Sequence, residues 1–339
     1  MTTAIRAERV SSGKQFAIYT MTLCLVAAAL SGCAPIAVSV GLVFLFAGPH
    51  NWLEFRYFIS RLPSSWGPFK SFFLFSCCGI AVLTLSYITM AVCNESLTGQ
   101  TATLVYSTWY SLLVVWVVGL IRLRSRHRPR RDWTTCLSVA LLVLSAIWAA
   151  PSYFGLTLVF LHPLMGLWIL EREINRKRPG WRKAYHACLW LVPLCLGFIW
   201  CCSSDTSICS TLVGISNLES DPIAIRTAEH AGCALLPDIP THLLISSHAF
   251  LEMLHYGVWL LAIPAASGIF SNWNVANVPI ARKSALWKSI LIGATAAATM
   301  AVIILWIGLS VDYATVRDVY FTIAIAHVLA EVPLLLWTI

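Results

Sequence analysis

TATLVYSTWYSLLVVWVVGLI, residues 101–121, contains no charged side chain, and RLRSRHRPRR, residues 122–131, follows it directly. An apolar run of about 20 residues is long enough to cross the hydrocarbon core of a bilayer as an α-helix. A dense group of arginines beside such a run is typical of a cytoplasmic loop. This stretch therefore predicts a membrane-spanning helix that ends at the cytoplasmic surface.

The composition of the whole chain supports the same class. Of the 339 residues, 58% are hydrophobic and only 11% are charged, and the mean hydropathy is +0.77. A soluble domain carries about 25% charged residues, so this chain could not cover a soluble surface. We interpret residues 1–339 as a single integral membrane domain, with no room left for a soluble catalytic domain.

Ten apolar runs divide the chain, and each predicts a spanning helix because only a helix satisfies its own backbone in hydrocarbon. The predicted fold is therefore an all-α polytopic membrane helical bundle of about ten transmembrane helices. The second and fifth runs are short for a span. The runs cover about 16–33, 35–50, 71–93, 101–121, 134–150, 152–170, 185–204, 242–263, 287–310 and 319–338.

The basic residues set the predicted orientation. If the N-terminus is cytoplasmic and the chain crosses ten times, only Arg226 and Arg317 of the 23 Lys and Arg residues fall outside cytoplasmic segments. Such a bias in short loops orients membrane proteins, so both termini are expected in the cytoplasm. The basic loop at 122–131 is then a topology anchor, and the expected partner is the lipid bilayer, with no nucleic acid. The expected location is a bacterial inner membrane.

Three points stay open at this stage. The outer loop, 205–240, is acidic and contains Cys209 and Cys233, a pair that an oxidising compartment would allow to form a disulfide. Residues 30–33 (LSGC) match a lipoprotein cleavage box that ends at Cys33. The apolar chain that follows favours an uncleaved first helix, because a mature chain normally starts polar. The oligomeric state is also open.

Histidines and acids inside the predicted spans are the main functional signal, because ionisable groups in a membrane are costly and usually functional. They occur in four spans, and in three of these the residues lie three or four positions apart and so share a helical face. Counted at about 1.5 Å per residue from the outer ends, most of them lie between about 9 and 20 Å deep. We therefore expect them to meet in one buried pocket. They are His50 and Glu54 at the second span, His162 in the sixth, His248, Glu252 and His255 in the eighth, and His327 and Glu331 in the tenth.

Imidazole with carboxylate is the ligand set of non-haem iron and related divalent metals, and helical bundles build such sites from inward-facing residues. The histidines His50, His162, His248, His255 and His327 are the predicted ligands. The predicted catalytic groups, as ligand, base or support for a ligand, are Glu54, Glu252 and Glu331.

The preferred hypothesis is a membrane-embedded metal-dependent oxidoreductase or oxygenase that acts on a lipophilic small molecule. Its cofactor would be non-haem iron or another divalent transition metal, with haem the less favoured choice. Two alternatives remain: a proton-coupled transporter that uses the same residues, and a non-catalytic membrane component held together by a polar network. The other histidines, His127, His186, His230 and His242, are expected to be peripheral.

The segment GPHNWLEFRYFISRLP, residues 48–63, resembles a signature of an uncharacterised family of bacterial multi-span membrane proteins. More distantly, Pro49–His50 at a span end, with His248 and His255 on one later helix, is similar to the Brp/Blh family of membrane carotene oxygenases. That resemblance implies iron bound through histidines and oxygen chemistry on a lipophilic substrate.

Overall fold

The protein is helical throughout the part that the computed structural model describes, which is residues 2–93, 97–126, 134–202, 222–268 and 273–338. Nine helical segments in this part are long and apolar enough to cross a membrane. The fifth predicted span, 134–150, corresponds to the shorter α5 (Thr134–Ala149). The prediction of a polytopic helical bundle is confirmed. Cys209 and His127 lie outside the described residues.

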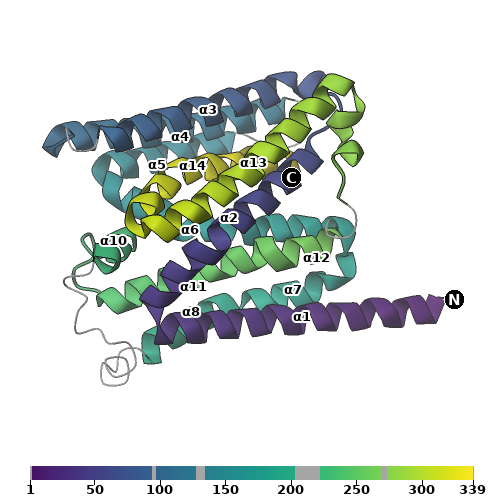
Figure 1. Cartoon of the computed structure of the whole chain (residues 1–339), viewed down its shortest axis with the longest axis horizontal. Helices are drawn as coiled ribbons and strands as arrows, with labels where there is room; N and C mark the ends of the chain where they lie inside the picture. The colour runs from purple at the N-terminus through teal and green to yellow at the C-terminus, as the bar shows by residue number, and fades with distance from the viewer. Residues whose placement is uncertain (1, 94–96, 127–133, 203–221, 269–272, 339) are drawn as a thin grey trace. The chain divides into compact units, whose positions relative to one another are not determined.

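The structure gives the following bounds, with the helices labelled in Figure 1. They are α1 (Thr2–Cys33), α2 (Pro35–Arg61), η1 (Gly67–Phe69), α3 (Lys70–Val92), α4 (Gly99–Ser125), α5 (Thr134–Ala149), α6 (Pro151–Lys177), η3 (Pro179–Trp181), α7 (Arg182–Leu189), α8 (Leu191–Cys202), α10 (Pro222–His230), α11 (Thr241–Gly257), η5 (Val258–Ala262), α12 (Ile263–Ser267), η6 (Val275–Asn277), η7 (Pro279–Arg282), α13 (Ala285–Val311) and α14 (Tyr313–Thr338).

Helix α2 is longer than the sequence predicts. The second apolar run, 35–50, was expected to end near residue 50, where Pro49, His50 and Asn51 interrupt the apolar pattern. The helix instead continues to Arg61. Pro49 has no N–H to bond the Leu45 carbonyl one turn earlier, and nearby Asn51 Nδ2 donates to the Ala47 carbonyl at 2.8 Å. Proline is tolerated inside membrane helices, and here the helix continues past Pro49. As a result, His50 lies near the middle of α2.

The helices form two compact units, and the first contains Met1–Glu54 and Val159–Trp273. Its central element is α11: in the segment Thr241–Ser267, 78% of the most apolar window is buried, against 33% or less in each of the other long helices described. Helices α1 and α8 pack along α11 (Figure 1). Their contact is a core of small and aliphatic side chains that includes Ala27, Cys195 and Leu254. Burial on this scale makes α11 the natural place for polar groups that must avoid lipid.

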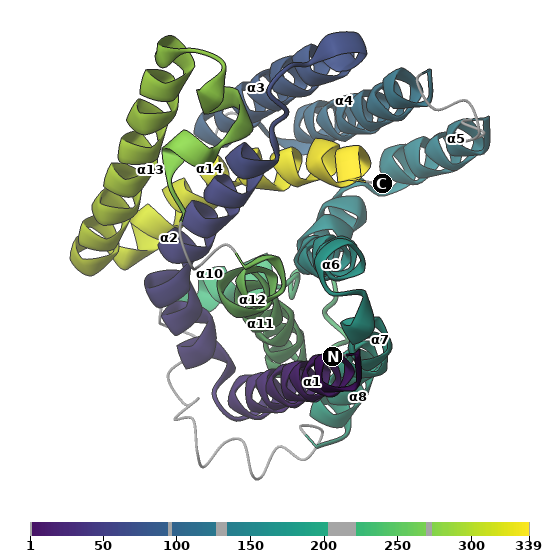
Figure 2. The same ribbon diagram turned by 90° about the vertical axis from the view of Figure 1, so that its right-hand side faces the viewer.

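The second unit contains Phe55–Leu158 and Asn274–Ile339. Helices α3, α4 and α14 pack on one another in it (Figure 2). Its core includes Phe72, Trp116 and Leu329, and the indole of Trp116 donates to the Phe75 carbonyl at 3.1 Å. Two predicted site residues lie on α14 of this unit.

Candidate metal centre

His50 and Glu54 lie one turn apart on α2, and each is only 1% exposed. A spacing of four residues puts both side chains on one face of the helix. The Nδ1 atom of His50 lies 3.1 Å from the Phe46 carbonyl oxygen. Because a carbonyl only accepts, Nδ1 must carry the proton, and in the neutral ring the lone pair is then on Nε2. The helix thus presents an imidazole nitrogen and a carboxylate side by side.

His255 on α11 is fixed in the same way. It is 2% exposed, and its Nδ1 lies 3.3 Å from the Pro163 carbonyl oxygen of α6. This bond again leaves the Nε2 lone pair for a ligand, as the outer hydrogen bonds of metal-binding histidines do. The next residues, Val258–Ala262, form a π-helical turn, a feature that occurs mostly at functional sites.

Helix α6 approaches His255 closely because residue 166 is glycine. A Cβ atom at Gly166 would lie 3.3 Å from His255 Nδ1 and 3.4 Å from Trp259 Nε1. One turn earlier on α6, the ring of His162 lies 4.6 Å from that of His255, centroid to centroid. The bare surface at Gly166 therefore lets Pro163 and His162 reach His255.

Three of these side chains form a compact donor group, called here the His50–Glu54–His255 group. Each offers one ligand atom, and these atoms lie within 4.8 Å of one another. The ring centroids of His50 and His255 are 5.5 Å apart. Ligand atoms bound at about 2.1 Å and at right angles lie about 3 Å apart, so small side-chain movements would bring the group onto one ion. Two histidines and one carboxylate are the donor set of non-haem Fe²⁺ sites with open positions.

Tyr256 connects this group to a second polar pair on α11. Its ring lies 4.4 Å from that of His50, and its hydroxyl donates to Glu252 Oε1 at 3.0 Å. The other carboxylate oxygen of Glu252 lies 3.9 Å from His248 Nδ1. Polar contacts therefore continue along α11 from the group toward the N-terminal end of the helix.

Of the predicted site residues, His50, His162 and His255 have rings that lie together in the first unit. Helix α2 runs through both His50 and Glu54, so the two side chains share a helical face, and Glu54 belongs to the donor group with His50 and His255. His248 and Glu252 are buried one to two turns before His255 and pair with each other. His327, half-buried, and Glu331, fully buried, lie on α14 of the second unit and are described with it.

Some residues around the group were not singled out from the sequence. Tyr256 lies four residues after Glu252, and Gly166 lies four after His162, so helical spacing was the signal that could have found both. His230 was expected to be peripheral, but its ring packs edge-on against His248, with centroids 5.0 Å apart. His186, also expected to be peripheral, is half-buried, and its Nε2 lies 3.3 Å from Glu171 Oε1.

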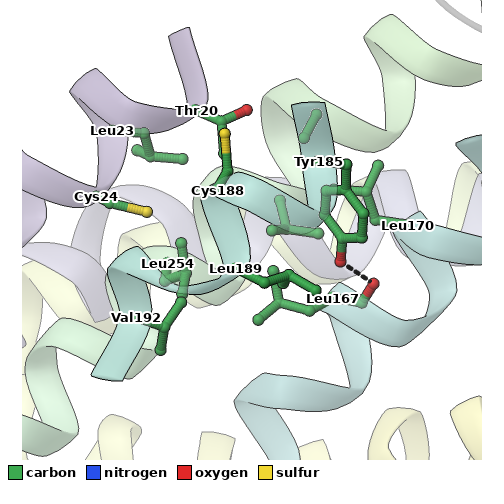
Figure 3. A pocket seen from close by; sticks show the side chains of 12 residues that line it. Thr20, Leu23, Cys24, Leu167, Leu170, Tyr185, Cys188, Leu189, Val192 and Leu254 are labelled. Carbon is green, nitrogen blue, oxygen red and sulfur yellow. Dashed lines mark hydrogen bonds between the residues drawn. The ribbon is translucent and has the colours of Figure 1, made fainter. Parts of the chain in front are cut away.

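An apolar pocket lies on a neighbouring face of α11 (Figure 3). Leu254 and Val258, which flank His255 along the helix, line it together with Leu23 and Cys24 of α1. The Tyr185 hydroxyl at its edge donates to the Leu167 carbonyl at 2.6 Å. With that hydroxyl bonded, the lining is mainly hydrocarbon, and the free volume of about 10 Å³ is only enough for about one water molecule.

Comparison of the chain with family models, with curated proteins and with solved structures finds no match. Fold and site alone therefore define the class. The chain is a multi-span helical membrane protein with a buried group of two histidines and one glutamate that can bind a metal ion.

Proposed function

We propose that this protein is a membrane-embedded metal-dependent oxidoreductase of the oxygenase type that acts on a lipophilic substrate. The His50–Glu54–His255 group carries the proposal, because its three donor atoms lie within 4.8 Å of one another. Its donor set suits Fe²⁺ or a related divalent metal and leaves open positions for oxygen or substrate.

The surroundings of the two imidazoles favour a single ion over haem. The ring of Tyr256 packs on His50 at 4.4 Å and that of His162 on His255 at 4.6 Å. Neighbours this close leave little space for a porphyrin, whose iron would need an imidazole perpendicular to a wide planar ring. A single ion needs only the three donors and a small open volume.

The position of the group in the chain supports a lipophilic substrate. Its three residues lie within helical segments that are long and apolar enough to span a membrane, where a molecule soluble in hydrocarbon can approach them. Substrate classes that fit are a fatty acyl chain, a carotenoid or a quinone. A bound metal would supply the redox chemistry, while the protein residues would hold the ion and exclude water.

Metal content is the decisive measurement. Protein purified in detergent and analysed by mass spectrometry of its metals should contain about one transition-metal ion per chain. Each of the variants His50→Ala, His255→Ala and Glu54→Gln should lose that metal, because each removes one of three ligands. His186→Ala is the matched control, since it removes a half-buried histidine from another His–Glu pair, and it should keep the metal.

A folded wild-type protein that binds no added Fe²⁺, Co²⁺ or Zn²⁺ would contradict the proposal. pH-dependent solute uptake into proteoliposomes would then test proton-coupled transport through the same histidines and acids. If metal is present, oxygen consumption with each of the three substrate classes tests the oxygenase step.

A further inference from the structure

A line of polar side chains leads from the surface of the first unit to the buried donor group. It begins at His230 on α10, whose ring contacts that of His248 at 5.0 Å. His248 Nδ1 lies 3.9 Å from Glu252 Oε2. Tyr256, which bonds Glu252 and packs on His50, completes the line. Because His248, Glu252 and Tyr256 are spaced four apart, they share one face of α11.

Burial increases along this line. His230 is half-buried at the end of α10, which is held against α11 by Ala231, Leu244 and Ile245. His248 and Glu252 are each 7% exposed, and the donor group is 1–2% exposed. The line therefore runs from an accessible end to a site with almost no solvent contact.

Charges near the accessible end favour cations. Glu229 precedes His230, Asp238 lies in the turn before α11, and both are exposed. Exposed acids raise the local concentration of cations and their rate of capture. One opposing charge, the exposed Arg226, also lies on α10. Two acids and the first imidazole thus mark an entrance.

A metal ion bound at the donor group needs such a route, because an ion without ligands is strongly disfavoured in apolar surroundings. The sides of the line are apolar: Phe160 packs edge-on against His248 at 5.6 Å, and Phe250, Leu251 and Leu254 are buried around the same helix. Imidazole nitrogen and carboxylate oxygen are ligands for divalent transition metals. Side chains one turn apart could pass an ion from one to the next.

We propose that His230, His248 and Glu252 form the entry route by which a divalent transition-metal ion reaches the His50–Glu54–His255 group. This inference rests on the proposed function, since it requires that group to bind metal. These three residues then control the rate of loading, while the donor group controls how much metal is held.

Loading kinetics with Co²⁺ separate the two roles. Metal-free protein in detergent is mixed rapidly with Co²⁺, and the absorption of the bound ion is followed with time. His248→Gln and Glu252→Gln should slow loading by at least about tenfold, with unchanged final stoichiometry and spectrum. His230→Gln, a change at the half-buried end of the line, should also slow loading and is the least disruptive of the three. His186→Gln, the matched control, should load at the wild-type rate.

Each result has a separate meaning. Wild-type loading rates in folded His230→Gln, His248→Gln and Glu252→Gln proteins would overturn the entry route and leave the metal site intact. Reduced stoichiometry in His248→Gln or Glu252→Gln would also overturn it, because those residues would then be ligands. If the wild-type protein binds no Co²⁺, the proposed function fails, and the entry route fails with it.

Discussion

At the scale of single residues, Gly166 shows how little space surrounds His255. A methyl group there would lie 3.3 Å from His255 Nδ1 and 3.4 Å from Trp259 Nε1, which is closer than ordinary van der Waals contact. The hydrogen bond from His255 to the Pro163 carbonyl depends on the same approach of α6. A side chain at position 166 would therefore disturb the bond that fixes which nitrogen of His255 can bind a metal.

We predict that Gly166→Val lowers the free energy of unfolding by about 1–3 kcal/mol, because it overpacks the contact between α6 and α11. The affinity for Co²⁺ should fall by about tenfold or more as His255 loses its supporting hydrogen bond. Thermal unfolding in detergent and Co²⁺ titration measure the two effects. Gly197→Val is the control, because a Cβ atom at Gly197 would meet nothing within 4 Å. Equal behaviour of both variants would contradict the prediction.

The residue scale also shows what the sequence could and could not predict about the site. Helical spacing predicts that His248 and His255 share a face of one helix, and they do. Seven residues separate them by about 10 Å along the helix axis, and of the two it is His255 that belongs to the donor group. The sequence alone could not say which of the two reaches His50, because that depends on how α2 and α6 pack against α11.

At the scale of elements, α2 brings His50 and Glu54 together. Hydropathy predicted an end near residue 50, because polar residues begin there and proline often ends helices. The helix nevertheless continues for eleven more residues, to Arg61. Two of its polar residues, His50 and Glu54, are buried in the protein, so the polarity at these positions does not mark a membrane surface. A residue can be polar because it lies at the membrane surface or because it is buried in a polar site, and a hydropathy pattern cannot distinguish the two. The nine other spans were easier to place for this reason.

Substitution of Pro49 tests whether the four-residue helical spacing of His50 and Glu54 is enough to place both side chains at the metal site. We predict that Pro49→Ala raises the free energy of unfolding, by at most about 3 kcal/mol, because it restores a backbone donor to the helix. The metal content should not change, since His50 and Glu54 keep their spacing of four residues. Thermal unfolding and metal analysis of the same preparation provide the measurement. Loss of metal in a stable Pro49→Ala protein would show instead that the proline shapes the site.

At the scale of the whole molecule, the orientation depends on the shortest apolar helix. Helix α5 has 16 residues, which at 1.5 Å per residue span about 24 Å, less than the hydrocarbon thickness of about 30 Å. A short span is accommodated by thinning of the bilayer at a modest cost. If α5 did not cross, the basic residues that follow α6, such as Arg178 and Lys183, would lie on the opposite side from Arg122 and Arg124. The positive-inside rule therefore requires α5 to cross.

Reporter fusions test this requirement directly. Green fluorescent protein fused after Arg126 and after Lys177 should fluoresce in both cases, because both positions are predicted to be cytoplasmic. Alkaline phosphatase fused after Ala150 should be active, because that position, between α5 and α6, is predicted to face outward. Arg126 and Lys177 fusions that report opposite sides would show that α5 does not cross the membrane. The entrance at His230 would then face the cytoplasm, and the protein would take its metal from the cytoplasmic pool.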